Sequence, residues 1–405
     1  MPSATVTMEG HIIDSLALPK VWDTIMDLGG DFEVTEFRVG KEKNAPSFLT
    51  MTVEAETEER LSEVLSAIQA YGAAPVDVGE ARLEAVVQPG VFPAGFYSTS
   101  NQPTFVRQDG RWLEVEHIEM DCGIAVEEGR AFCLPVDEAA AGQRIVVGHV
   151  GVRVHPLERA RERELFGFMQ SQVSAEKPKK LIIGDIAQAM RSTRADGGDI
   201  LFVAGPAVIH TGAGRHLAAL IRGGWLQVLF SGNALAAHDI ESALFGTSLG
   251  IDLESGLGTE HGHAHHIQAI NEIRRAGSIA AAVEQGVLKQ GVMYEATRAG
   301  VEFVLAGSIR DDGPLPDVLT DVIVAQKRMR DVIHRRDIRL AMMLGSMLHS
   351  IATGNLLPAT VRAVCVDIDP AVVTKLADRG SFQTIGLVTD VESFLRELAL
   401  DLGAS

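Results

Sequence analysis

Apolar residues recur with two different periods along the first 90 residues, which predicts alternating strands and helices. The segments with a period of two are predicted strands: residues 5–13, 32–39 and 48–53. The segments with helical spacing are residues 18–28 and 58–71, the second with Leu61, Val64, Leu65 and Ile68 on one face. With a last strand at residues 82–87, this order predicts a ferredoxin-like α+β domain over residues 1–90.

The pattern changes between residues 91 and 156, where short β-branched and aromatic segments are separated by glycine and acidic turns. This arrangement predicts a small β-rich module. Residues 157–180 are strongly charged and are predicted to form a linker.

The rest of the chain, residues 181–405, alternates apolar strand segments with amphipathic helical segments. The predicted strands are residues 200–203, 226–230, 302–305, 338–344, 363–367 and 383–387. The predicted helices include residues 216–221, 234–244, 265–275, 318–334 and 370–379. Repeated strand-helix units predict an α/β fold with a doubly wound, Rossmann-like parallel sheet, whose ligand site lies at the carboxyl ends of the strands.

Composition and charge narrow the classes of function. The 405 residues are 46% hydrophobic, as in a globular protein, and the net charge of −18 disfavours a nucleic-acid partner, because phosphates require clustered cations. No apolar run reaches the about 18 residues of a membrane span, and the N-terminus lacks the pattern of a signal peptide. Three cysteines without a disulfide framework favour a reducing compartment, so we expect a cytoplasmic protein with no membrane partner.

Glycine-rich turns follow several of the predicted strands. In the first turn, Gly205, Gly212 and Gly214 depart from the dinucleotide fingerprint G-x-G-x-x-G, so close packing of strand and helix explains them as well as a ligand does. Gly232 ends the next strand, and Asn233 is expected to cap the helix that follows.

Three later turns share this design. Residues 307–318 form a loop rich in acids and prolines, and Ser346 opens a helix after a strand and a glycine. Asp367 ends an apolar strand, where its carboxylate either accepts ribose hydroxyls or caps the next helix. Because parallel strands end at one edge of their sheet, the turns together indicate a nucleotide cofactor, and hence an enzyme.

Four histidines, His261, His263, His265 and His266, lie within six positions beside Glu260. The segment offers neither an H-x-x-x-H spacing with a glutamate base nor a distant cysteine pair, so no metal is expected. Proton transfer near neutral pH, or substrate binding, is the favoured role. Helix capping and loop packing remain the alternative.

Asp121, Cys122 and Arg310 are further candidates outside the histidine segment. Asp121 is a candidate acid or base. Cys122 has no evident cationic neighbour that would lower its pKa, so a buried structural thiol is favoured over a nucleophile. Arg310 either clamps a substrate carboxylate with both guanidinium arms or pairs with a neighbouring aspartate.

Longer motifs resemble a known family. The region that resembles lysine-oxoglutarate reductase/saccharopine dehydrogenase proteins is MEGHIIDSLALPKVWDTIMDLGGDFEVTEFRVGK. The motifs that resemble archaeal-type ornithine cyclodeaminases are MDCGI, VVGHVGVRVHPLERAR, GHAHHIQAINEIRRAGSIAAAV and LAGSIRDDGPLPDV. The same unit forms the C-terminal part of bifunctional arginine dihydrolase/ornithine cyclodeaminases. The resemblance covers nearly the whole chain from Gly10, without the dihydrolase domain, so no guanidine chemistry is expected.

The resemblance implies a C-terminal nucleotide domain that is similar in fold to deoxyhypusine synthase and binds NAD. Carried over motif by motif, the NAD contacts are Asn233, Ala234, Asp312, Leu344, Gly345, Ser346, Met347, Asp367, Asp390 and Val391. All but the last two lie in turns that the residue pattern selects independently.

The resemblance also implies the conversion of L-ornithine to L-proline and ammonia, with a hydride lent to NAD and returned. For this reaction we assign proton transfer to His263 and His265, the carboxylate clamp to Arg310, and the δ-ammonium anchor or an acid–base role to Asp121. Lysine or another diamino acid stays an alternative substrate, because one methylene changes binding by only about 1–3 kcal/mol.

Three other functions stay open. They are an amino-acid or saccharopine-type dehydrogenase that releases NADH, a non-catalytic sensor of NAD and an amino acid, and a metal-dependent hydrolase that uses the histidines. A homo-oligomer, either a dimer or a tetramer, is expected.

Overall fold

The computed structural model describes residues 1–10, 12–13, 17–41, 45–69, 71–76, 79–155, 179–248, 251–252, 264–311, 313–378 and 384–404. Its contacts divide the chain into two units. These units are Met1–Gly167 with Leu357–Thr360, and Phe168–Leu356 with Val361–Ser405.

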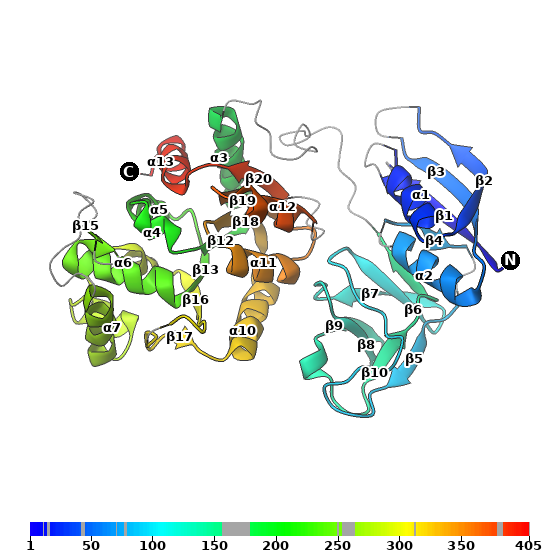
Figure 1. Cartoon of the computed structure of the whole chain (residues 1–405), viewed down its shortest axis with the longest axis horizontal. Coiled ribbons are helices and arrows are strands. Elements are labelled where there is room, and N and C mark those ends of the chain that lie inside the picture. Colours follow the sequence, from blue (N-terminus) through cyan, green and yellow to red (C-terminus); the bar gives the residue numbers. More distant parts are fainter. Residues whose placement is uncertain are drawn as a thin grey trace. The chain divides into compact units, whose positions relative to one another are not determined.

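The first unit begins with a four-stranded antiparallel sheet covered by two helices (Figure 1). Its elements are β1 (Ser3–Gly10), α1 (Ala17–Asp27), β2 (Asp31–Arg38), β3 (Ser47–Glu54), α2 (Glu58–Gln69) and β4 (Ala74–Pro75). The strand order β2-β3-β1-β4 is that of a ferredoxin-like fold, which confirms the prediction. The core forms because the strands bury every second residue, such as Leu49, Met51 and Val53, against the helices' apolar faces.

One strand of this prediction was wrong. Residues 82–87 do not complete the first sheet: β5 (Arg82–Ala85) pairs with β10 (Arg144–Val147) in the second sheet. The two-residue β4 takes the fourth position instead, at the sheet edge where Pro75, which has no N–H, is tolerated. The alternation of apolar residues shows which face of a strand is buried. It does not show which neighbouring strand provides the hydrogen bonds, so it cannot assign the strand to a sheet.

The rest of the first unit is a β-rich module with the strand order β11-β6-β7-β9-β8-β10-β5, as predicted. Its remaining elements are β6 (Thr104–Gln108), β7 (Arg111–Glu116), β8 (Gly123–Glu127), β9 (Arg130–Leu134), the short 3-10 helix η1 (Val136–Glu138) and β11 (Val152–Val154). All neighbouring strands are antiparallel except β7 and β9, which run parallel.

The second unit contains a seven-stranded sheet with the order β17-β16-β13-β12-β18-β19-β20, parallel throughout. Its strands are β12 (Asp199–Ala204), β13 (Val228–Gly232), β16 (Glu302–Ala306), β17 (Val318–Leu319), β18 (Ile338–Leu344), β19 (Arg362–Asp367) and β20 (Thr384–Val388). The chain moves outward from β12 to β17 and then returns to the other side of β12. This doubly wound topology confirms the Rossmann-like prediction and places a switch point between β12 and β18.

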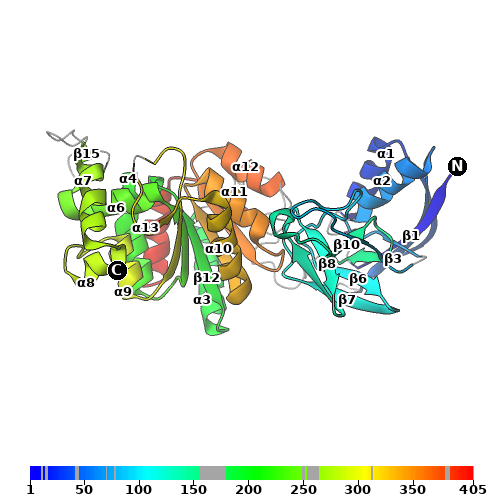
Figure 2. The same ribbon diagram turned by 90° about the horizontal axis from the view of Figure 1, so that it is seen from below.

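Helices cover both faces of this sheet, with α10, α11 and α12 on one face and α3, α5 and α13 on the other (Figures 1 and 2). The helices are α3 (Lys179–Ala195), α4 (Ala207–His210), α5 (Gly214–Arg222), α6 (Asn233–Phe245), α7 (His265–Ala276), α8 (Ile279–Glu284), α9 (Val292–Arg298), α10 (Val322–Arg335), α11 (Met347–Leu356), α12 (Pro370–Asp378) and α13 (Val391–Asp401). A small hairpin of β14 (Thr247–Ser248) and β15 (Ile251–Asp252) follows α6.

One predicted boundary in this half was wrong. The helix expected at 318–334 begins at Val322, because Val318 and Leu319 pair with β16 as the short strand β17 and Asp321 caps the helix. The domain boundaries at residues 90, 156 and 180 stay predictions. None of the helices in the described part of the chain is long and apolar enough to span a membrane.

Candidate functional site

The turns after β12 and β18 meet at the switch point of the parallel sheet. The N–H of Gly205 donates to the carbonyl of Leu344 over 2.9 Å. A Cβ atom on Gly205 would lie 2.0 Å from the carbonyl oxygen of Gly345, so only glycine allows this approach. Gly345 itself has φ +57°, a left-handed conformation that favours glycine. Bare backbone therefore lines the edge, the arrangement that a dinucleotide requires at such a point.

The turn after β13 corrects one prediction. Asn233 does not cap α6: it is the first residue of that helix, and the N-cap is Gly232, which offers no side chain. The buried Oδ1 of Asn233 instead accepts from the N–H of Leu315 over 3.0 Å. Asn233 thus anchors the loop after β16, and the N-cap Gly232 offers no side chain to the first N–H groups of α6. This arrangement also fits a phosphate-bearing ligand.

The loop after β16 is held by its own acids and by neighbouring helices. The Asp311 carboxylate accepts from the N–H of Ser308 over 2.8 Å, and Arg274 on α7 donates to the carbonyl of Pro314. Arg310 lies exposed near the loop tip, and no described carboxylate forms an ion pair with its guanidinium. The alternative in which Arg310 pairs with Asp311 is therefore not seen, and the one in which it pairs with Asp312 stays untested. Asp312 lies outside the described residues.

His349 on α11 lies at the same edge, although the sequence pattern did not single it out. Its Cε1 would be 3.0 Å from a Cβ on Gly232, and its Nδ1 lies 3.3 Å from Oγ of Ser346. Burial lowers the pKa of His349, partly offset by a hydrogen bond to the Ala306 carbonyl and by the charge of Asp311. A neutral imidazole therefore joins the ends of three strands. The sequence could have indicated His349 by its spacing, because it lies three residues after Ser346 and therefore on the same face of the predicted helix.

Asp367 and Asp390 end the two outer strand turns. Oδ1 of Asp367 accepts from the N–H of Asp369 over 2.9 Å, and its side chain is almost buried. Asp390 is the N-cap of α13 and accepts from the N–H of Ser393. Both carboxylates thus accept a local backbone N–H. The bond of Asp367 lies before α12, and Asp369 is the residue that accepts from the N–H of Ala371 in that helix, so the cap that the sequence left as an alternative for Asp367 is not what the structure shows. The neighbouring Val391 contacts the switch point, with Cγ2 3.5 Å from the Cβ position on Gly345.

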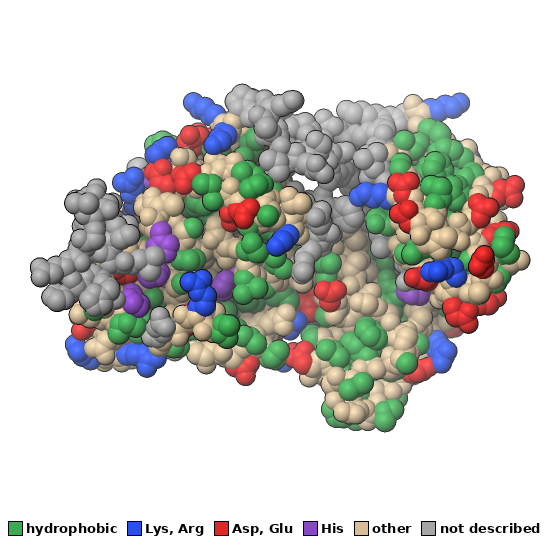
Figure 3. All heavy atoms as spheres, viewed as in Figure 1, with side chains coloured by type: hydrophobic (Ala, Val, Ile, Leu, Met, Phe, Trp, Pro, Cys, Tyr) green, Lys and Arg blue, Asp and Glu red, His purple; other side chains and the backbone are tan. Residues whose placement is uncertain are grey.

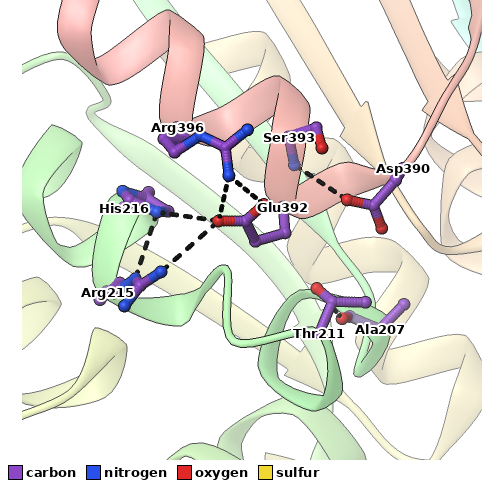
Figure 4. A network of polar contacts seen from close by, with 8 residues as sticks. All are labelled: Ala207, Thr211, Arg215, His216, Asp390, Glu392, Ser393 and Arg396. Atoms are coloured by element: carbon purple, nitrogen blue, oxygen red, sulfur yellow. Dashed lines mark hydrogen bonds and ion pairs between the residues drawn. The ribbon is translucent and has the colours of Figure 1, made fainter.

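An ion-pair network ties α13 to α5 beside these residues (Figure 4). Glu392 points toward Arg396 on its own helix and toward Arg215 and His216 at the start of α5. The contact distances are 2.8, 3.5 and 3.4 Å respectively. Arg215 and His216 belong to α5, which follows the turn after β12, and Glu392 lies in the first turn of α13 beside Asp390 and Val391. The ion pairs therefore hold Asp390 and Val391 near the turn after β12.

The predicted histidine segment is only partly described, because His261 and His263 lie outside the described residues. His265 opens α7, with Nδ1 2.9 Å from Oγ1 of Thr247 and its ring stacked on Phe245. Histidine side chains reach the surface of the second unit in Figure 3. Within the described residues, no group of three His, Cys, Asp or Glu side chains is placed to hold a metal ion.

Two candidates lie in the first unit. Asp121 is exposed in the turn before β8, with φ +63°, and its N–H donates to the Thr99 carbonyl over 3.0 Å. Cys122 is buried, as predicted, with Sγ 3.0 Å from Oε1 of Glu119. A hydrogen bond with Cys133 and burial raise the pKa of Cys122, which keeps it a protonated thiol rather than a nucleophile.

The structure therefore collects most of the predicted nucleotide residues at one sheet edge. These are Asn233, Ala234, Leu344, Gly345, Ser346, Met347, Asp367, Asp390 and Val391. The parallel sheet explains the grouping, because every one of these residues ends a strand or begins the helix after it.

Family models match the whole length of the second unit's sheet and most of the first unit. "Arginine dihydrolase ArgZ-like, C-terminal, Rossmann fold" matches residues 184–398. "LOR/SDH bifunctional enzyme conserved region" matches residues 3–102, and "Arginine dihydrolase ArgZ-like, C-terminal, first region" matches residues 103–183.

Named relatives agree with these models. An ornithine cyclodeaminase of Methanopyrus kandleri is 55% identical over 98% of this chain and 96% of its own length. The structure of cyanobacterial ArgZ, described as an arginine dihydrolase, is 38% identical with a TM-score of 0.87, and covers 99% of this chain and 58% of its own. The ternary complex of AgrE with ornithine and NAD⁺ is 43% identical with a TM-score of 0.54, over 99% of this chain and 57% of that one. The chain thus belongs to the ornithine cyclodeaminase family, the unit that also forms the C-terminal part of ArgZ-like arginine dihydrolases.

Proposed function

We propose that this protein is an NAD-dependent ornithine cyclodeaminase, which converts L-ornithine to L-proline and ammonia. The observation that carries the proposal is the full-length relative of that name at 55% identity. A relative crystallised with ornithine and NAD⁺ shares the whole of this chain's length and supports both the substrate and the cofactor.

The NAD site that we propose is the carboxyl edge of the parallel sheet. It comprises Asn233, Ala234, Asp312, Leu344, Gly345, Ser346, Met347, Asp367, Asp390 and Val391. The close approach of Gly205 to Gly345 and the uncapped start of α6 support it, since both leave backbone groups for phosphates. The nearly buried Asp367 supports a contact to ribose hydroxyls, because a carboxylate at a strand end accepts such bonds.

When bound, NAD supplies a temporary acceptor for the hydride of the substrate Cα. The protein must then remove protons from the two substrate ammonium groups, let the δ-nitrogen bond to Cα, and return protons as ammonia leaves. Overall, ornithine becomes proline and ammonium without a net change in hydride or protons. The site must also exclude water, which would hydrolyse the intermediate imine.

We assign the proton transfers to His265 and His263, the substrate carboxylate clamp to Arg310, and the δ-ammonium anchor to Asp121. The assignment of His265, the first residue of α7, is supported by its hydrogen bond to the Thr247 hydroxyl. Arg310 is supported by an exposed guanidinium without a described ionic partner, on the loop that Asn233 anchors beside the sheet edge. Asp121 is supported by its exposed carboxylate.

We also propose a cytoplasmic homo-oligomer, either a dimer or a tetramer. The free, buried cysteines fit a reducing compartment. Val322, Ile323 and Val324 at the start of α10, and Leu348 on the adjacent α11, are exposed apolar side chains, which a subunit contact would cover. Light scattering during gel filtration gives the mass; a monomer at micromolar concentration would contradict this assembly.

The test is to incubate the protein with L-ornithine and NAD⁺ and to follow proline, ammonia and NADH absorbance together. Equal amounts of proline and ammonia, without accumulated NADH, are expected. Stoichiometric NADH would make the protein a dehydrogenase. NAD binding without any product would leave a sensor or another diamino acid as substrate, which parallel incubations with lysine distinguish.

A further inference from the structure

Glu241 on α6 is fully buried, and its two carboxylate oxygens contact different side chains. Its Oε2 lies 2.8 Å from Nδ1 of His238, one turn earlier on the same helix. Its Oε1 accepts the hydroxyl proton of Thr247 over 2.9 Å. Burying a charge is costly unless it is hydrogen-bonded, so this carboxylate requires both donors.

Thr247 extends the network to His265. Its hydroxyl proton is used toward Glu241, so its oxygen accepts from Nδ1–H of His265 over 2.9 Å. The carboxylate therefore sets the tautomer of two imidazoles, His238 directly and His265 through one hydroxyl. In both rings the proton is held on Nδ1, which leaves Nε2 as the proton-accepting nitrogen.

The helix α6 begins at the proposed cofactor edge, and His238 and Glu241 lie further along the same helix. Ala234, His238 and Glu241 are spaced by four and three residues, so they share one face of the helix. His238 is about 6 Å along the axis from Ala234, at 1.5 Å per residue. The short helix α4 also joins the proposed cofactor edge to the network. It begins at Ala207, whose Cβ is 3.0 Å from the Cβ position on Gly345, and it ends at His210.

The surrounding titratable groups are also imidazoles. The His210 ring on α4 has its centroid 4.8 Å from that of His238, and the His266 ring on α7 lies 6.2 Å away. Nδ1 of His210 contacts Oγ of Ser248 over 2.7 Å, so its hydrogen-bond partner differs from that of His238, although the charge of Glu241 also acts on its pKa. A purely structural role explains a packed histidine, but it does not require a buried carboxylate that reaches two histidines on different helices. A carboxylate that holds the tautomer of an imidazole is the arrangement that general-base catalysis uses.

We propose that Glu241 is the positioning residue of this enzyme, orienting His238 directly and His265 through Thr247 for the proton transfers of the reaction. The inference rests on the proposed function and adds His238 to its proton-transfer residues. One imidazole takes a proton from a substrate ammonium group, and an oriented imidazole returns a proton to the departing ammonia. No proton is gained or lost overall, as the balance of the reaction requires.

The decisive variants are Thr247→Val, which keeps the shape but removes the hydroxyl, and Thr247→Ser, which restores it. Thr247→Val is expected to lower kcat by about 10- to 100-fold, up to the lower end of the range of general acid–base catalysis, with KM within about twofold. NAD affinity, measured by calorimetry without substrate, is expected to stay within about twofold. Thr247→Ser should recover most of the rate. Glu241→Gln removes the charge and leaves one acceptor oxygen in place of two, so at least one of the two links is lost, and it is expected to lower kcat further, by about 10²- to 10³-fold.

Ser248→Ala is the matched control, because it removes a hydroxyl–imidazole bond from the same strand without touching Glu241. Its kcat should stay within about twofold of the unmodified enzyme. Equal losses from Ser248→Ala and Thr247→Val, or an unchanged rate in Thr247→Val, would overturn the proposal. So would a parallel loss of NAD affinity, which indicates general damage to the fold.

A second readout does not depend on turnover. In ¹⁵N-histidine NMR of the NAD-bound protein, His238 and His265 should both show the Nδ1–H tautomer, each assigned by its absence in the His238→Asn and His265→Asn variants. Glu241→Gln should shift both signals, and Thr247→Val that of His265 alone. An Nε2–H tautomer in the unmodified protein would refute the positioning role, even if ornithine were turned over. If the unmodified protein turns over no ornithine but shows these tautomers, the proposed substrate is wrong rather than the network.

Discussion

The carboxyl group of Asp239 offers a quantitative test of how α6 is joined to α9. Asp239 is buried, and its two oxygens accept from the N–H groups of Val292 and Met293, each over 2.8 Å, at the start of α9. Burial raises its pKa from the ordinary value of 3.8 to about 6, although both N–H bonds oppose the shift. The folded protein therefore binds this proton more tightly than the unfolded chain.

The sign of the stability effect follows from this difference. Between pH 3.8 and about 6 the folded state holds more protons than the unfolded state, so the free energy of unfolding falls as pH rises through this range. A shift of about two units, at 1.36 kcal/mol per unit, amounts to about 3 kcal/mol. Above the folded pKa the loss is complete and the contribution no longer depends on pH.

Asp239→Asn removes the titration and keeps the shape. Its amide can accept only one of the two N–H groups, which costs about 1–3 kcal/mol at every pH. The unfolding free energy of the unmodified protein minus that of the variant should fall by about 2.4 kcal/mol from pH 4 to pH 7, because the unfolded carboxyl group is already partly ionised at pH 4. Urea unfolding followed by fluorescence measures it, with Trp22 and Trp112 replaced by Phe so that Trp225 alone reports on the second unit.

A flat difference curve would refute this reasoning, because it would mean that burial does not shift the carboxyl group. A curve that rises with pH would mean that the two N–H groups of α9 stabilise the carboxylate by more than burial destabilises it.

Three further predictions concern the sheet edge. Gly205→Ala forces its Cβ against the carbonyl of Gly345 and should weaken NAD binding by at least about tenfold, which calorimetry measures; unchanged affinity would show that the turns can separate freely. Asn233→Ala should lower the unfolding free energy by about 1–3 kcal/mol, because the buried N–H of Leu315 loses its acceptor. Asn233→Asp keeps the acceptor and should lose NAD affinity alone. Equal unfolding free energies of the two variants would show that the bond contributes nothing. Asp390→Ala should cost about 0.5–2 kcal/mol as the N-cap of α13 is lost, and Asp390→Asn, which still caps, should retain stability; the same urea titration distinguishes them, and two equally unstable variants would contradict the capping role.

Much of the architecture was predictable from periodicity. The strands of the second sheet and the face of α2 that carries Leu61, Val64 and Ile68 follow from which residues recur at which spacing. Periodicity reports on the environment of a single element, so it failed wherever a partner decided the outcome. The strand β5 was assigned to the wrong sheet for this reason, and Val318 was placed in a helix rather than in β17.

The candidate site divides in the same way. The turns that hold Gly205, Gly345 and Asp367 were selected by the sequence because a parallel sheet brings every strand end to one edge. Asn233 was expected to cap its own helix, but its partner is Leu315, 82 residues away. His349 was not predicted, since no local pattern shows that it lies over Gly232.

The sequence by itself therefore determined the α/β class, the strand ends of the proposed nucleotide edge, and, through resemblance, the family. The tertiary structure alone decided which side chains meet, as when Glu241 joins His238 to Thr247 and thereby to His265. The physical reason is that burial and backbone pairing repeat along each element and leave a periodic trace in the sequence. A hydrogen bond between side chains on different elements depends on how those elements pack, and it leaves no such trace.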